Sequence, residues 1–214
     1  MDNDIYKNGW NRINAYIFGI IMSDGCLLLE GRNKTALAIR ICLNDYDMIS
    51  RLHHYMCIGN KIYKEGNNYT LKYRNENSIK FLMQYGLTFR KSLTLQFPDI
   101  PQKFLCDFIR GYFDGDGSIV LTQTKYNVYG QVSFTCGSVD FLVNLQKILK
   151  NVFGIDSQIY NGGHPDTQTM SLKITKRSAI EMFSDLIYNN TDLYLLRKYN
   201  KFQELNKHPL KYKK

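Results

Sequence analysis

The stretch that decides the fold is nine residues long and occurs twice. IFGIIMSDG occupies residues 17–25, and IRGYFDGDG occupies residues 109–117, 92 residues later. Apolar residues surround a glycine in each copy, and each copy ends in aspartate followed by glycine. This pattern predicts two buried helices, each of which ends at its Asp-Gly pair.

Four further blocks recur in the same order, which indicates a duplication with longer loops in the second copy. The paired blocks are residues 39–52 with 132–145, 61–63 with 158–160, 70–82 with 171–183, and 90–91 with 197–198. We therefore divide the chain into an N-terminal repeat with a short linker, residues 1–97, and a C-terminal repeat with a basic tail, residues 98–214.

Each repeat alternates helical and strand patterns. The second strands show period two, with Leu37, Ile39 and Ile41 apolar on one face. Amphipathic helices follow, then a second strand pair near residues 61–65 and 69–74, or 156–161 and 169–175, and a last helix at 77–85 or 177–188. The predicted class is α+β: two pseudo-symmetric αββαββα repeats, each with a four-stranded antiparallel sheet.

Composition narrows the function. The formal net charge is +9, which favours an acidic partner, and nucleic acid is the commonest one. No window approaches the roughly 18 apolar residues of a membrane span, so no membrane partner is expected. Five cysteines form no CxxC pair, and the N-terminus lacks a secretory pattern. We expect an intracellular protein, in a prokaryotic cytoplasm or an organelle, and not a secreted one.

The motif glycines and aspartates suggest a shared site. Gly19 and Gly111 would let two helix backbones approach to about 8 Å, so the repeats are expected to pack through these helices. Asp24 and Asp116 would then lie near one pseudo-twofold axis. Two such carboxylates repel each other unless a cation neutralises them.

A hard divalent ion suits this arrangement. Mg²⁺, or Mn²⁺, accepts carboxylate, carbonyl and water oxygens and supports phosphodiester hydrolysis. The predicted metal site lies between the two repeats and uses Asp24, Asp116 and the backbone carbonyls of Ser23 and Gly115. Because the minor groove is only about 6 Å wide, neighbouring sites of this kind would reach both strands and give a staggered cut.

The paired motifs and the order of the elements resemble the single-chain, two-repeat LAGLIDADG homing endonucleases along nearly the whole chain. The resemblance implies a monomer that binds double-stranded DNA, serves intron homing, and makes a metal-dependent staggered double-strand cut in a long asymmetric site. It also implies catalytic roles for Asp24 and Asp116. Lys91 and Lys198 resemble the family's active-site lysines, which stabilise negative charge at the phosphate; the alternative is a solvated surface lysine.

If the aspartates face DNA, the period-two rule selects the strand residues that face it too. The second half replaces Arg40 by Ser133, Lys61 by Gln158 and Arg74 by Thr175, so the first half should be more cationic and prefer more G·C contacts. The predicted DNA-binding residues are Arg32, Arg40, Lys61, Tyr63, Thr70, Lys72, Arg74, Ser118, Thr122, Thr124, Gln131, Ser133, Gln158, Tyr160, Ser171 and Lys173.

Two other functions remain open at this level. A basic sheet face also suits RNA, so a group I intron maturase that binds its own intron RNA is one alternative. A non-cleaving DNA-binding regulator on the same fold is the other. Retention of both Asp24 and Asp116 argues against the regulator, because a pure binder has no use for two carboxylates that face phosphates.

Overall fold

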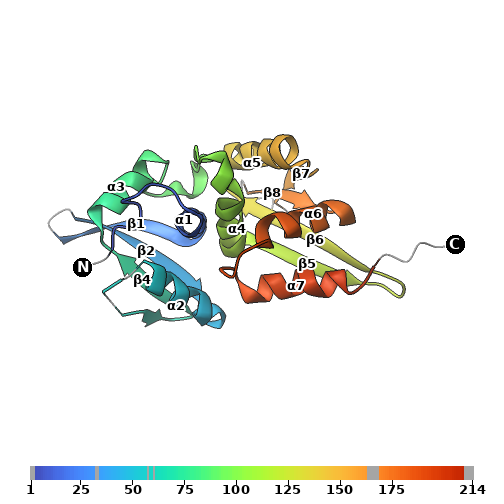
Figure 1. Cartoon of the computed structure of the whole chain (residues 1–214), viewed down its shortest axis with the longest axis horizontal. Coiled ribbons are helices and arrows are strands. Elements are labelled where there is room, and N and C mark those ends of the chain that lie inside the picture. The colour runs from blue at the N-terminus through green and yellow to red at the C-terminus, as the bar shows by residue number, and fades with distance from the viewer. Residues whose placement is uncertain (1–2, 32–33, 57, 60, 163–168, 210–214) are drawn as a thin grey trace. The chain divides into compact units, whose positions relative to one another are not determined.

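The computed structural model describes residues 3–31, 34–56, 58–59, 61–162 and 169–209. The predicted DNA-contacting residue Arg32 lies outside the described residues. The chain forms two compact units, Met1–Gly115 and Asp116–Lys214, each built around one sheet (Figure 1).

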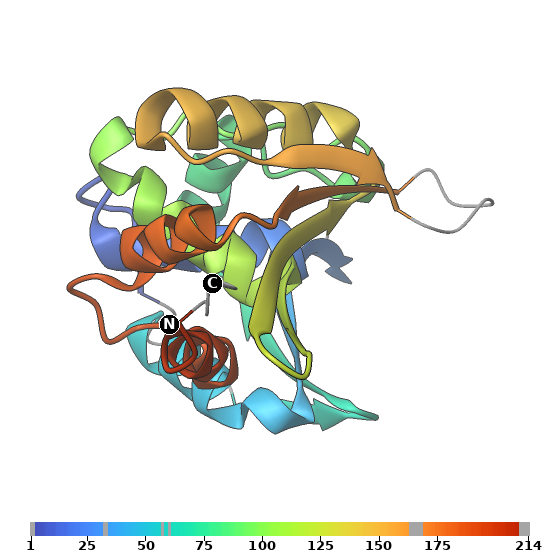
Figure 2. The ribbon, with the colours of Figure 1, turned by 90° about the vertical axis from the view of Figure 1, so that its right-hand side faces the viewer.

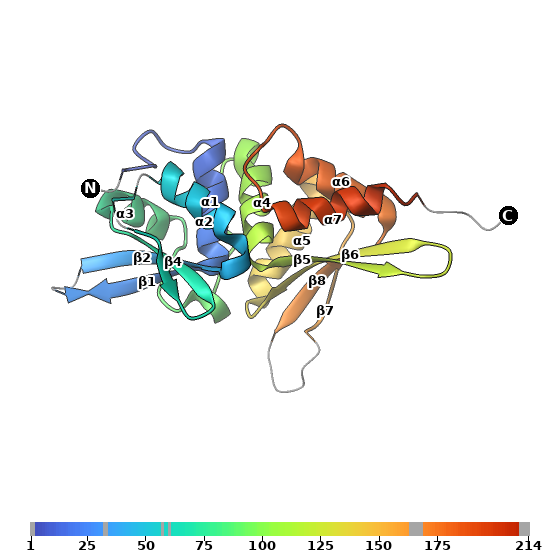
Figure 3. The same cartoon turned by 90° about the horizontal axis from the view of Figure 1, so that it is seen from below.

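The first unit contains a four-stranded antiparallel sheet in the order β1-β2-β4-β3. Its helices pack on one side of this sheet (Figure 3), over the apolar face that includes Leu37, Ile39 and Leu71. Its elements are α1 (Arg12–Asp24), β1 (Gly25–Glu30), β2 (Lys34–Cys42), η2 (Leu43–Asp45), α2 (Tyr46–Tyr55), β3 (Tyr63–Glu65), β4 (Asn68–Tyr73), α3 (Glu76–Gln84), η3 (Lys91–Leu93), η4 (Gln102–Phe104) and α4 (Leu105–Asp116), whose last residue opens the second unit.

The second unit repeats this sheet in the order β5-β6-β8-β7. Helices α5, α6 and α7 pack along one side of the sheet (Figure 2), over the buried Val132, Phe134 and Leu172. Its elements are β5 (Gly117–Gln123), β6 (Val128–Cys136), α5 (Val139–Phe153), β7 (Gln158–Asn161), β8 (Met170–Ile174), α6 (Arg177–Tyr188) and α7 (Leu196–Asn206).

The predicted α+β class and the αββαββα order of both repeats are confirmed. The structure adds α7, which the sequence pattern did not predict because its face toward the sheet is short and interrupted by polar residues. The two compact units divide after Gly115, because α4 packs on α1 through Gly111 and Gly115. The boundary at residues 97 and 98 stays a prediction of where the repeats join.

The backbones of α1 and α4 touch at two glycines. A Cβ added to Gly19 would overlap the carbonyl of Phe108 and lie 2.5 Å from the Tyr112 nitrogen. A Cβ added to Gly111 would overlap the carbonyl of Tyr16 and lie 3.1 Å from the Cα of Gly19. Both neighbours are backbone atoms of buried helices and have no room to move away. The predicted close approach of the motif helices is therefore present within the first unit.

We expect Gly111→Ala to lower the free energy of unfolding by about 3 kcal/mol, because the new methyl group overlaps a main-chain carbonyl in a packed core. Gly31→Ala is the matched control, since a Cβ at Gly31 meets nothing within 4 Å. Urea unfolding followed by circular dichroism compares the two variants. Equal stability of both variants would contradict this account of the helix contact.

Within the described residues, no helix combines the length and apolar character needed to cross a membrane.

Candidate functional site

Asp24 is the last residue of α1, and its position follows from the burial of that helix. Residues 14–22 are all buried, so the helix is surrounded by protein on every side. The helix ends where the Gly25 N–H donates to the Ile21 carbonyl and the chain turns directly into β1. Asp24 is half-buried at this turn, between a rigid helix and a rigid strand.

Lys91 binds the backbone on both sides of Asp24. Its side chain is nearly buried, with 8% of the residue exposed, and its Nζ donates to the Gly25 carbonyl at 2.6 Å and to the Ser23 carbonyl at 3.3 Å. The preceding Arg90 adopts a left-handed conformation, φ 55°, which turns the chain into η3. Lys91 is thus no solvated surface lysine; it stabilises the negative end of the α1 dipole.

Gly115 brings the C-terminal part of α4 against the Asp24 side chain. A Cβ at Gly115 would overlap Ser23 Oγ and lie 2.7 Å from Asp24 Oδ2. The motif spacing predicted only a carbonyl role for Gly115. Its contact with Ser23 and Asp24 is a third close approach of the two motif helices. Asp116 is the next residue and is exposed.

The oxygen donors near Asp24 suit a hard cation. The described residues contain no group of three or more His, Cys, Asp or Glu side chains that could hold a metal. A metal here would therefore need carboxylates, backbone carbonyls and water, a donor set typical of Mg²⁺. The Ser23 carbonyl already accepts from Lys91 and has one further lone pair to offer.

In the second unit, Lys198 lies in the first turn of α7 and is also buried, with 3% exposed. Three residues later on the same helix, Lys201 Nζ donates to the Ile119 carbonyl of β5 at 3.0 Å. The comparison of the two repeats did not identify Lys201, because α7 was not predicted. On a helix, residues three apart lie on the same face, so Lys198 and Lys201 are neighbours on α7.

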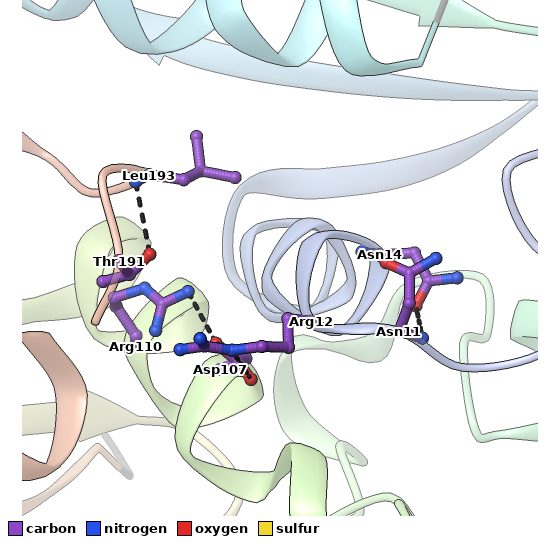
Figure 4. Close-up of polar contacts among 7 residues, drawn as sticks. All are labelled: Asn11, Arg12, Asn14, Asp107, Arg110, Thr191 and Leu193. Atoms are coloured by element: carbon purple, nitrogen blue, oxygen red, sulfur yellow. Dashed lines mark hydrogen bonds and ion pairs between the residues drawn. The ribbon is translucent and has the colours of Figure 1, made fainter. Parts of the chain in front are cut away.

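An ionic network, buried at Asp107 and Arg110 and half exposed at Arg12, joins the other end of the α1–α4 pair (Figure 4). Arg110 donates to Asp107 Oδ1 at 2.8 Å, and both side chains are almost fully buried. Arg12 reaches the same carboxylate from α1, with Nε 3.3 Å from both oxygens. The Arg110 guanidinium also lies 5.0 Å from the centre of the Tyr16 ring, whose hydroxyl donates to Asp114. This places Asp114 in support of the helix contact.

Asp107→Asn should lower the free energy of unfolding by about 3 kcal/mol, because it removes the anion that compensates a buried guanidinium. Asp156→Asn provides the comparison: it breaks an ion pair with Lys150 whose two side chains are both more than half exposed, and we expect little change. Thermal and urea unfolding measure both. A destabilisation that is the same in the two variants would contradict the role given to Asp107.

The first sheet presents a polar face opposite its helices. Cys26, Ala38 and Lys72 are direct cross-strand neighbours on this face, followed by Arg40, Thr70 and Tyr63. Arg40 and Tyr63 are exposed, as a base-reading role requires. Thr70, in contrast, is 1% exposed and donates to Glu65, so the structure removes it from the accessible DNA-facing set.

The other three predicted DNA-contacting residues described in this unit are Lys61, Lys72 and Arg74, and their surroundings differ. Lys72 and Arg74 lie beside Glu30, which forms ion pairs with both. Arg74 follows the last residue of β4. Lys61 is exposed but precedes β3, so the strand alternation does not fix its direction.

The second sheet carries an equivalent polar face. Ser118, Ser133, Lys173 and Gln158 run across its four strands, and the Ser118 and Ser133 hydroxyls hydrogen bond at 2.8 Å. Tyr160 is exposed, donates to Gln158 and lies under the Lys173 ammonium. The half-exposed Gln131 and the exposed Thr122 belong to the same face.

Two predicted residues of this sheet lie in settings that the strand alternation did not predict. Ser171 is buried, with 6% exposed. Thr124 lies beyond β5, where its hydroxyl donates to the Asn127 carbonyl and accepts from the Asn127 N–H, closing the hairpin turn. Sequence alternation missed two exposed members of the face: Tyr129, opposite Thr122, and Thr135, opposite Ser171.

The registers correct one equivalence between the halves. Gly25 pairs with Ile39, and Gly117 pairs with Phe134, so Arg40 corresponds to Thr135 and not to Ser133. The error arose because a shift of two residues leaves a strand's faces unchanged. The first half absorbs the two extra residues in η2, between β2 and α2. In the corrected pair of Arg40 and Thr135, the positive charge still belongs to the first half.

Comparison with known proteins defines the class. Residues 103–199 match the family model described as LAGLIDADG-like domain. The match confirms the resemblance for this range, which contains the second motif, residues 109–117.

Solved LAGLIDADG homing endonucleases share the fold across both halves. I-GzeII in complex with its DNA target matches with a TM-score of 0.63 and 13% identity over 92% of this chain and 89% of that one. I-AabMI bound to uncleaved DNA matches with a TM-score of 0.62 and 13% identity over 92% of this chain and 90% of that one. I-SmaMI bound to cleaved DNA matches with a TM-score of 0.63 and 12% identity over 92% of this chain and 88% of that one. The chain has the two-domain fold of these enzymes.

Two curated archaeal proteins are similar in sequence. The probable translation initiation factor IF-2 of Methanocaldococcus jannaschii is 28% identical over 164 residues, 72% of this chain. The protein of the same name from Thermococcus kodakarensis is 26% identical over 178 residues, 78% of this chain. The matches span 12% and 14% of the length of those proteins, so the function in their names is not carried over.

Proposed function

We propose that this chain is a site-specific DNA endonuclease that acts as a monomer, binds a long asymmetric duplex site and makes a staggered double-strand cut with Mg²⁺ or Mn²⁺. Asp24 and Asp116 are the proposed catalytic and metal-binding residues. Lys91 and Lys198 are proposed to act beside them.

The observation that carries this proposal is the setting of Lys91 around Asp24. A buried ammonium that donates to the carbonyls of residues 23 and 25 holds the turn that presents Asp24. It also places positive charge where a phosphate would approach a carboxylate. A lysine with no role beyond solubility would not be buried at this turn.

The contact of Gly115 with Asp24 supports a shared role for Asp116. Gly115 lies against the Asp24 carboxylate, and Asp116 is bonded to it. A divalent ion held by these carboxylates and the Gly115 carbonyl would neutralise their charge and lower the pKa of a bound water. In this proposal, the buried helix and Lys91 position Asp24, and Lys91 offers its charge to the developing negative charge on the phosphate.

The sheet faces support recognition of DNA. Arg40, Lys72 and Arg74 on the first sheet can donate to guanine, and Gln131 and Gln158 on the second can pair with adenine. A two-stranded ribbon fits the major groove. The different side chains of the two faces support an asymmetric site. The three solved structures reported above, all of them DNA complexes, share this fold.

Asp24→Asn and Asp116→Asn are each expected to abolish double-strand cleavage and to retain specific DNA binding, because the change removes metal-binding charge and leaves the sheet faces intact. Gel shift and cleavage assays, on a duplex site selected from a randomised library with the parent protein and with Mg²⁺ present, measure the two properties on the same preparation. Cleavage at the parental rate in either variant would contradict the catalytic assignment. Binding without cleavage in the parent itself would favour the regulator.

Lys91→Met should slow cleavage by about 10²-fold or more at saturating enzyme, by loss of a charge donor near the phosphate. Specific affinity should change little. Lys80→Met is the control, since the Lys80 side chain on α3 is 73% exposed and belongs neither to the proposed site nor to the proposed DNA contacts. A melting curve of each variant confirms that it is folded. If both variants cleave alike, Lys91 serves the fold and not the reaction.

A further inference from the structure

Glu30 is a carboxylate that lies among the cations on the polar face of the first sheet. Glu30 is the last residue of β1, and its Oε2 accepts from Arg74 Nε at 2.7 Å while Oε1 accepts from Arg74 Nη2 at 3.1 Å. Lys72 Nζ lies 3.8 Å from Oε1. Glu30 belongs neither to the proposed catalytic pair nor to the proposed DNA contacts.

The two hydrogen bonds fix how the guanidinium is turned. A single hydrogen bond would let the planar group rotate, whereas a bidentate pair sets both its position and its plane. The Arg74 hydrogen bond, with the charges of Arg74 and Lys72, lowers the pKa of Glu30 below its ordinary value. The carboxylate therefore stays ionised at neutral pH and keeps its hold on Arg74.

Among the described residues of the second sheet, the two equivalent positions hold no ion pair. Thr122 stands in the place of Glu30, as the strand registers show, and Thr175 follows β8 where Arg74 follows β4. Lys173 remains in the place of Lys72. An arrangement needed only to stabilise a hairpin end would be expected in both halves. Its restriction to one half fits a role in reading sequence.

We propose that Glu30 is a specificity-determining residue and that Glu30 and Arg74 read one G·C base pair as a unit. This inference rests on the proposed DNA-binding function of the sheet face. Arg74 donates to guanine O6 and N7, and the carboxylate accepts from the amino group of the paired cytosine. Glu30 also offsets part of the local positive charge, which lowers the attraction to phosphates of any sequence.

Glu30→Gln in the full chain tests this proposal, with Glu65→Gln as the matched control. Glu65 lies on the same sheet face and accepts from Thr70, so its variant loses the same charge without touching Arg74. Both variants should bind unrelated duplex DNA more tightly. In selection from a randomised site library, only Glu30→Gln should lose about tenfold discrimination at one G·C position in one half-site.

Arg74→Lys provides a second, independent variant, because it keeps the charge and loses the bidentate geometry. It should lose discrimination at the same position as Glu30→Gln, and it decides the matter if Glu30→Gln fails to fold. Unchanged preference in both variants, or a uniform loss across the site, would overturn the inference. A parent protein that selects no duplex sequence would instead overturn the proposed function itself.

Discussion

The rest of the first unit depends on the contact between the backbones of α1 and α4. Gly19 and Gly111 leave no space for a side chain on either helix, so the separation of the two helices is set by main-chain atoms. Gly115 extends the same contact to Asp24. The network of Arg12, Asp107 and Arg110 fixes the opposite end. The proposed catalytic carboxylate thus stands on a helix that is held at both ends.

Lys91 connects this helix pair to the end of the first repeat. It lies after α3, far along the chain from the motif, yet its ammonium binds the carbonyls around Asp24. The Lys91 side chain therefore has a structural contact and a proposed catalytic role at the same place. Its charge is stabilised by the helix dipole while it is buried, and it remains beside the place where a phosphate would gain negative charge.

Much of the fold was readable from the sequence because its signals are repeated. Two motifs with glycine at the same position predicted the helix pair, and period-two alternation predicted the four strands of each sheet. Burial was less readable: Thr70 and Arg40 alternate alike, yet Thr70 is buried against its neighbours and Arg40 is exposed. The two-residue slip that paired Arg40 with Ser133 left every face unchanged, so no pattern of polarity could reveal it.

The sequence did not predict which side chains pair with each other. Nothing in the order of residues indicates that Glu30 and Arg74 meet. Glu30 ends β1 and Arg74 follows β4, and β2 lies between these two strands in the sheet. The burial of Lys91 and Lys198 was equally hidden, since a lysine after a helix is normally solvated. Helix α7 was missed because few of its residues reach the core: of its eleven, Lys198, Phe202 and Leu205 are buried.

The burial of α1 also has a consequence for synthesis on the ribosome. Nine consecutive residues of this helix are buried in the finished unit, and part of their cover is α4. Some eighty residues separate the end of α1 from the start of α4. At about 5–20 residues per second, the nascent helix waits roughly 4–16 seconds for its partner. During that interval its apolar surface is open to chaperones and to aggregation, so slow translation between the two motifs should lower the yield of folded protein.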